Sequence, residues 1–226
     1  MICMENTQKQ LSFQEIFKEA LEFFERNAKN ILIGYLVVAI GSTALFFLPT
    51  ALKSFIATAL FMIFISAVYH ADKSKTQLSL DTLKTLLESR FLPVFALSIL
   101  FTVFYIIGCF LLILPGIYLM IALQFATWTL IFKPDTKFFD TLQHSRNLTK
   151  GRMWNIFVIN IIAGIVIFIV FGIASLIFSF ALGMLGMGET IIASVNYILS
   201  LIISVLAIIF QLFLYIRVEA SYKPGV

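Results

Sequence analysis

Charged residues are scarce in this chain, and its long apolar runs contain almost none. Asp, Glu, Lys and Arg make up 12% of the sequence, whereas soluble domains carry roughly 25%. The hydrophobic share is 61% and the mean hydropathy is +1.01. A water-soluble core of 226 residues does not need this much apolar surface. The composition therefore predicts an integral membrane protein and excludes an ordinary soluble domain.

Cysteine and the usual catalytic patterns are also scarce. Cys3 and Cys109 are the two cysteines, and their spacing matches no metal or redox motif. No Ser-His-Asp arrangement, glycine-rich phosphate loop or paired-carboxylate motif occurs, and His70 and His144 fall at the edges of apolar runs. We therefore expect no catalytic residues, no cofactor, no metal site and no enzymatic activity. Nucleic acid is not an expected partner, because the net charge is only +4 and is dispersed.

What the sequence does contain is a series of runs long enough to cross a membrane. A hydrocarbon layer about 30 Å thick needs roughly 20 apolar residues in a helix. These runs do not alternate between apolar and polar residues, which argues against a membrane β-barrel. Short turns connect them in pairs, so the sequence predicts an all-α polytopic membrane protein with six transmembrane helices arranged as three hairpins. The six runs cover residues 31–48, 51–70, 91–114, 117–132, about 153–183 and 191–216.

A polar, amphipathic segment precedes each of these pairs. Ser12 to Glu15 has the capping-box pattern of a helix start, and apolar residues follow it at spacings of three and four. Ser79 and Asp81 give a second helix start, and Gly151 is a plausible stop for a third helix. We predict a single integral membrane domain over residues 1–226. It would contain three similar units, 12–70, 79–132 and 138–216, each an amphipathic helix on the cytoplasmic face followed by a hairpin.

The distribution of positive charge predicts the orientation. Of the 16 Lys and Arg residues, all except Lys53 lie in the N-terminal segment, the two polar connectors or the C-terminal tail. Cytoplasmic loops of membrane proteins carry this excess of positive charge. Both termini are therefore expected in the cytoplasm. On the other side lie only short turns that contain Lys53 and Glu189.

Neutral polar residues follow one side of several runs. Two interpretations remain open for Gln124, Asn160, Asn196 and Gln211. The first, which we favour, is helix-to-helix packing, because small and polar residues mediate close contacts between transmembrane helices. The second is that these four amides converge on a polar cavity for an amphiphile. Ionisable residues, which ion- or proton-coupled transport usually requires inside the bilayer, are missing from the runs.

The connector before the fifth run is the most basic segment. Its cations include Lys137, Arg146, Lys150 and Arg152. They could contact anionic lipid headgroups, since each surface cation contributes about 1 kcal/mol near a negative leaflet. The alternative, which we favour, is a topology signal that needs no specific ligand.

Two motifs in the second half of the chain suggest a family. Ile113-Leu-Pro-Gly-Ile-Tyr118 is followed, after a run of spanning length, by Asp140-Thr-Leu-Gln-His-Ser-Arg-Asn-Leu-Thr149 and Lys-Gly-Arg. These segments resemble the uncharacterised YciC-like family of bacterial inner-membrane proteins. They are also similar to the membrane domain that precedes some glycerophosphodiester phosphodiesterases. The resemblance implies a six-span inner-membrane fold without recognised catalytic residues. The catalytic domain of the phosphodiesterases is not expected in this sequence, so their hydrolase activity is not carried over. Residues 49–53 form a tighter turn than several members have.

Two functional hypotheses follow. The chain is either a non-enzymatic membrane component that interacts with membrane lipids, a membrane-protein partner or further copies of itself, or a permease for a lipid-like or uncharged small molecule. The expected location is the inner membrane of a bacterium, with several spans. A water-filled groove lined by the polar residues would favour the permease, and dry contacts between helices would favour the first hypothesis.

Overall fold

The fold is helical throughout the part of the chain that the structure describes. A computed structural model describes residues 12–44, 50–111, 113–133 and 136–222. The helices are α1 (Phe13–Ala44), α2 (Thr50–Ser74), α3 (Leu80–Leu111), α4 (Ile113–Leu123), α5 (Ala126–Phe132), α6 (Phe138–Thr149), α7 (Met153–Met184) and α8 (Glu189–Ala220). The all-α prediction is confirmed for these residues.

Four of these helices are long and apolar enough to cross a membrane. They are Phe55–Ser74, Leu80–Val103, Met153–Met184 and Glu189–Ala220, so the prediction of membrane-spanning helices is confirmed. The total of six stays a prediction. The first expected run ends beyond the described part of α1. The turn predicted at residues 49–53 is wrong for residues 50–53, which begin α2, and residue 49 lies outside the described residues. The fourth run corresponds to a shorter apolar segment, Gly116–Phe132.

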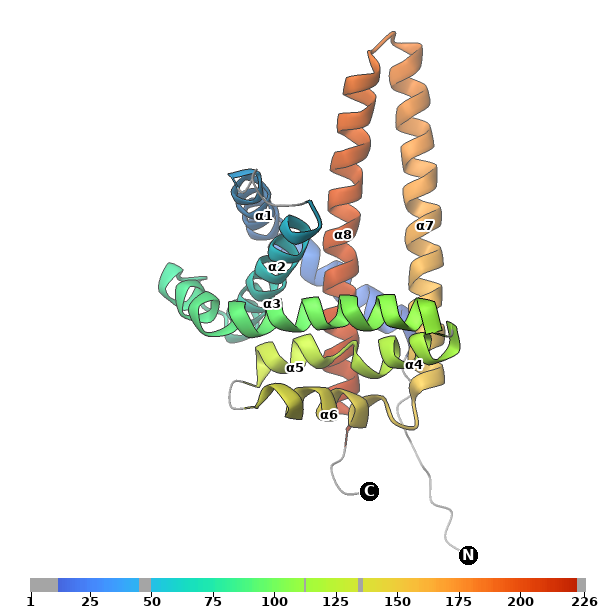
Figure 1. Cartoon of the computed structure of the whole chain (residues 1–226). Coiled ribbons are helices and arrows are strands. Elements are labelled where there is room, and N and C mark those ends of the chain that lie inside the picture. Colours follow the sequence, from blue (N-terminus) through green and yellow to red (C-terminus); the bar gives the residue numbers. More distant parts are fainter. Residues whose placement is uncertain (1–11, 45–49, 112, 134–135, 223–226) are drawn as a thin grey trace, which may run out of the picture. The chain divides into compact units, whose positions relative to one another are not determined.

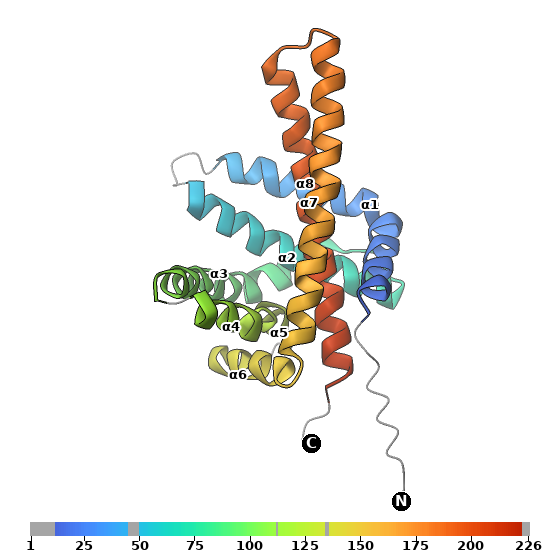
Figure 2. The same ribbon diagram turned by 90° about the vertical axis from the view of Figure 1, so that its right-hand side faces the viewer.

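The chain forms two compact units. The hairpin unit combines α7, α8 and the start of α1 up to Glu22, and the layered unit comprises Phe23–Met153. In the hairpin unit, α7 and α8 run antiparallel and side by side along their length (Figures 1 and 2). Gly186, with a φ of +70°, lies in the turn between them, a conformation that glycine adopts without strain. The starts and ends of both helices agree with the sequence prediction to within four residues.

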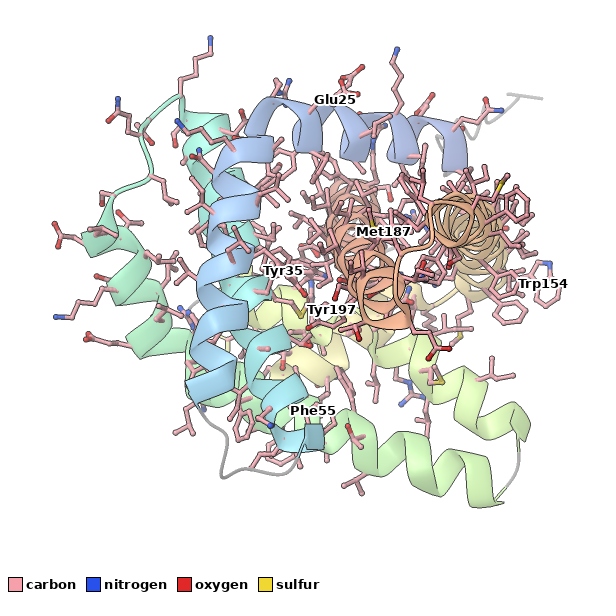
Figure 3. All side chains as sticks on the ribbon, turned by 90° about the horizontal axis from the view of Figure 1, so that it is seen from above. Glu25, Tyr35, Phe55, Trp154, Met187 and Tyr197 are labelled. Carbon is pink, nitrogen blue, oxygen red and sulfur yellow. The ribbon has the colours of Figure 1, made fainter. Side chains whose placement is uncertain are left out.

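Both helices of the hairpin are longer than a bilayer requires. Each has 32 residues, which corresponds to about 48 Å at 1.5 Å per residue, against a hydrocarbon layer of about 30 Å. Trp154, at the start of α7, is 72% exposed and points away from the neighbouring helices (Figure 3). Tryptophan is enriched at the headgroup level of membranes, which is consistent with an exposed position at the end of a spanning helix. An upright α7 starting there would extend beyond the opposite interface unless it tilts.

The layered unit stacks its helices. α2 packs against α3, α3 against α4 and α5, and α6 against both α4 and α5. Figures 1 and 2 show α3, the α4 and α5 pair, and α6 as successive layers. α5 lies in the middle, and its residues from Ala126 to Ile131 are all buried. The ring of Trp128, 1% exposed, is the largest fully buried side chain.

Close approach of α1 and α2 depends on one glycine. A Cβ atom added to Gly34 would lie 2.2 Å from the ring of Phe64, so only glycine leaves room for that ring. Gly34 therefore allows a close contact between the two helices. Gly164, Gly172 and Gly183 of α7 have nothing within 4 Å of such an atom among the described residues, so no close helix contact is found at these glycines.

The connectors differ from the predicted separate helices. α1 and α3 each continue from the amphipathic segment into the apolar run without a break, because neither glycine nor proline interrupts the junction at residues 28–31 or 88–91. Ser79 does begin α3, where its hydroxyl accepts a hydrogen bond of 3.1 Å from the Thr82 amide. Only the amphipathic segment before the fifth run forms a separate helix, α6. Gly151, with a φ of +77°, follows it as expected.

The fourth apolar run is broken between α4 and α5. The backbone leaves the helix at Gln124 and Phe125, so an intrahelical partner is lost on each side. Ser145 of α6 restores both: its hydroxyl donates to the Ala122 carbonyl at 2.8 Å and accepts from the Phe125 amide at 3.2 Å. In an apolar environment such backbone groups must be satisfied. One buried hydroxyl therefore satisfies a backbone group on each side of the break.

Candidate functional site

Two groups of polar side chains connect α7 and α8. The Gln211 amide Nε2 donates to Asn160 Oδ1 at 2.9 Å. Further along the hairpin, the Ser175 hydroxyl donates to Asn196 Oδ1 at 2.7 Å. Asn196 also donates through Nδ2 to the Ser179 hydroxyl at 2.9 Å. Each group joins one helix to the other, and all five side chains are partly buried.

These hydrogen bonds show that the amides in the hairpin connect α7 to α8. Three of the four residues considered for a polar cavity, Asn160, Asn196 and Gln211, bond across the helix pair. Interhelical hydrogen bonds of this kind stabilise a membrane protein by about 0.6 kcal/mol on average. Gln124 belongs to the layered unit, where it lies at the break between α4 and α5. A cavity shared by all four amides therefore remains a prediction, while the helix-to-helix role is present for three of them.

An ion-pair cluster in the hairpin unit was not anticipated from the sequence. Arg217, near the end of α8, donates through Nε to Glu19 Oε2 at 3.1 Å and also through Nη2 to the other oxygen of the same carboxylate. Its Nη1 lies 3.4 Å from Glu15 Oε2. We call these three residues the clasp. Glu15 and Glu19 are one helical turn apart, so both reach one guanidinium. That spacing was the available signal, but nothing pointed to Arg217 as the partner.

The clasp ties the start of α1 to the hairpin. Arg217 is 25% exposed and the two carboxylates 53% and 39%, so solvent screens the pairs and each contributes at most about 1 kcal/mol. The ring of Phe13 lies 5.7 Å from that of Phe210. Figure 3, in which α7 and α8 are seen almost end-on, shows the first part of α1 running crosswise to them. This is the orientation expected of an amphipathic segment at a membrane surface.

An apolar pocket of about 70 Å³ lies where these helices meet. Phe17 and Leu21 of α1 form one wall of the pocket. The other walls come from α7, including Ala163 and Val170, and from α8, including Ile203 and Phe210. Its lining is almost entirely carbon. Such a pocket fits a hydrocarbon chain and offers nothing to a polar solute.

A second surface is the outer face of α6. Thr141, Ser145, Leu148 and Thr149 are buried on its inner side. Lys137, Arg146 and Lys150 are exposed, and Arg152, just after the helix, is half-buried. Phe139 is 78% exposed on the same short helix. The residues considered for headgroup contact thus lie on or next to one helix, together with an exposed aromatic ring.

The two histidines lie in the layered unit. The ring of His70 packs on that of Phe132 at 5.0 Å, and the Lys133 ammonium group lies 3.0 Å from His144 Nε2. Among the residues that the structure describes, no group of three or more His, Cys, Asp or Glu side chains could hold a metal ion. Pro134 and Asp135, which precede α6, lie outside this part of the chain.

Taken together, the described residues offer an apolar pocket, polar contacts between helices and a basic helix, each suited to lipid or to neighbouring helices. Comparison of the chain with protein-family models, with curated proteins and with solved structures finds no match.

Proposed function

We propose that the chain is a non-enzymatic component of a bacterial inner membrane that contacts anionic lipid headgroups through α6. In this proposal both termini lie in the cytoplasm, and α6 rests on the cytoplasmic surface of the bilayer. The observation that carries it is the pairing of a buried inner side of α6 with exposed cations on the helix, Arg146, and at its two ends, Lys137 and Lys150.

Electrostatics and burial together support this role. Each cation near a negatively charged leaflet contributes about 1 kcal/mol, so three of them add up to about 3 kcal/mol if they act independently. The exposed ring of Phe139 adds apolar contact at the depth where aromatic residues are enriched. Because the inner side of α6 also holds the break between α4 and α5, the helix is fixed in place before any lipid binds.

The permease hypothesis receives less support. The amides that would line a path, Asn160, Asn196 and Gln211, bond across α7 and α8, and the pocket in the same unit has an apolar lining. A solute path would need polar groups that face an open space. A specific observation in favour of transport is therefore missing from the described residues.

Native mass spectrometry from nanodiscs of stated composition tests the proposal. The protein is placed in equimolar phosphatidylethanolamine and phosphatidylglycerol, released, and scored for retained phosphatidylglycerol. The triple variant Lys137→Gln, Arg146→Gln, Lys150→Gln should retain clearly less of it than the unaltered protein. A matched triple variant, Lys18→Gln, Lys29→Gln, Lys84→Gln, removes three exposed cations from α1 and α3 and should have a smaller effect. Equal losses in the two variants would contradict a specific role for α6.

A further inference from the structure

The apolar pocket of the hairpin unit has a charged neighbour at one end. Arg217 follows Phe210 by seven residues, or about two helical turns, so both lie on the same side of α8. Phe210 lines the pocket, and Arg217 holds Glu15 and Glu19 in the clasp. The pocket and the clasp are therefore neighbours along α8, with the apolar lining deeper and the charges towards the end of the helix.

The clasp is negative as a whole. Two carboxylates share one guanidinium, which leaves a formal charge of −1, and Glu15 remains 53% exposed. A carboxylate has about four lone-pair sites, and a single long contact to Arg217 leaves Glu15 able to accept from another donor. A lipid headgroup that carries only negative charge would be repelled here, whereas one with an ammonium group would find an acceptor.

We propose that the pocket holds an acyl chain of an amine-headed zwitterionic phospholipid, with the ammonium group of that lipid on Glu15 and its phosphate towards Arg217. The surrounding helices are long and apolar enough to span a membrane, so hydrocarbon is the medium that fills an apolar opening between them. The inference rests on the proposed function only in that both place the chain in a bilayer. The lipid, the residues and the charge that selects the lipid differ from those of α6.

The occupant is tested with the same equimolar nanodiscs, scored this time for retained phosphatidylethanolamine. With the α6 changes Lys137→Gln, Arg146→Gln and Lys150→Gln as background, the protein should retain it about fivefold over phosphatidylglycerol, the factor that corresponds to ~1 kcal/mol. Val170→Trp places a large ring in the pocket and should remove the preference. Ile173→Trp is the matched control, because Ile173 on the same helix is as exposed as Val170, 55% against 56%, but does not line the pocket. It should behave like the unaltered protein.

The headgroup contact is tested separately. Glu15→Gln keeps the two-point contact between Arg217 and Glu19 but removes the net negative charge of the clasp, and should reduce the preference severalfold. Glu22→Gln, one to two turns away and paired with Lys18, should leave it unchanged. Thermal unfolding of every variant shows whether the fold is intact. Equal retention of the two lipids on the α6 triple-variant background, or phosphatidylethanolamine retention by Val170→Trp equal to that by Ile173→Trp, would mean annular lipid only and overturn the proposal. The proposal for α6 is scored by phosphatidylglycerol and this one by phosphatidylethanolamine, so the two can fail independently.

Discussion

The helices α5 and α7 are both apolar but have opposite environments. α5 is buried at every position from Ala126 to Ile131. In α7 the buried residues are Ile156, Ile159 and Ala163, all in its first third. The rest of α7 exposes large apolar side chains, such as Phe168 at 76% and Leu176 at 72%. Apolar composition alone therefore shows that a helix avoids water, but not whether protein or lipid surrounds it.

The difference also explains how each helix is stabilised. α5 is enclosed by protein, so its stability comes from packing, which is sensitive to shape. α7 exposes apolar side chains over most of its length and is long and apolar enough to span a membrane; in lipid, the hydrophobic effect does not favour one helix contact over another. Its specific contacts with α8 are the hydrogen bonds made by Asn160, Ser175 and Ser179. Substitutions should therefore have large effects in the layered unit and small effects on the exposed part of the hairpin.

The largest difference is expected between two aromatic residues. Trp128→Ala empties a fully buried site and should lower the free energy of unfolding by about 3–5 kcal/mol. Phe168→Ala removes a ring that faces outward and should change it by about 0.5 kcal/mol or less. Unfolding in mixed micelles with increasing SDS measures both. Similar losses for the two variants would contradict the assignment of α5 to protein and α7 to lipid.

Two glycines give the next comparison. Gly34→Ala forces a Cβ atom into the ring of Phe64 and should destabilise the protein by about 1–3 kcal/mol. Gly172→Ala meets open space and should be neutral or stabilising by up to about 1 kcal/mol, because alanine favours the helix. The SDS unfolding midpoint of each variant provides the measurement. A midpoint for Gly34→Ala at or above that of the unaltered protein would rule out the close contact of α1 with α2.

Removal of the Ser145 hydroxyl tests the broken helix directly. Ser145→Ala leaves the Phe125 amide and the Ala122 carbonyl without their buried partner, at an expected cost of about 1–3 kcal/mol. Hydrogen exchange at Phe125 should speed up at the same time. Ser98→Ala is the control, because the Ser98 hydroxyl bonds to a carbonyl of its own helix and its loss should have little effect. Unchanged exchange at Phe125 would show that another group satisfies the break.

The smallest effect is expected in the hairpin. Asn196→Leu removes the bonds to Ser175 and Ser179 and should cost about 0.6–1.7 kcal/mol. Combined with Asn160→Leu, which removes the bond to Gln211, the loss should be roughly additive, because the two sites are far apart along the helices. Lipid retention should be unchanged in the double variant. If the double variant folded normally but lost transport of a solute, the polar-cavity interpretation would be supported instead.

Much of the helical architecture could be predicted because its signals are local. The bounds of α7 and α8 follow from the apolar runs, and Ser79 and Gly151 mark helix ends by their own chemistry. The break in the fourth run could not be found in this way. It depends on Ser145, which lies about twenty residues further along the chain.

The sites were predicted unevenly for the same reason. Polar stripes at helical spacing brought out Asn160, Asn196 and Gln211, and the structure gives each a partner on the facing helix. The clasp joins residues 198 positions apart, and no periodicity connects a carboxylate at one end of a chain with a guanidinium at the other. The pocket was missed because its lining consists of ordinary apolar residues, which become a site only when three helices meet.

The role of Ser145 has a consequence for how the protein is made. α4 and the start of α5 leave the ribosome before Ser145 does, so during synthesis the bend between them has two exposed peptide groups and no hydroxyl to meet them. Such a segment is a poor candidate for release into the lipid on its own. We therefore expect this segment to insert only after α6 has been translated. Ser145 would then determine the order of assembly in this half of the protein.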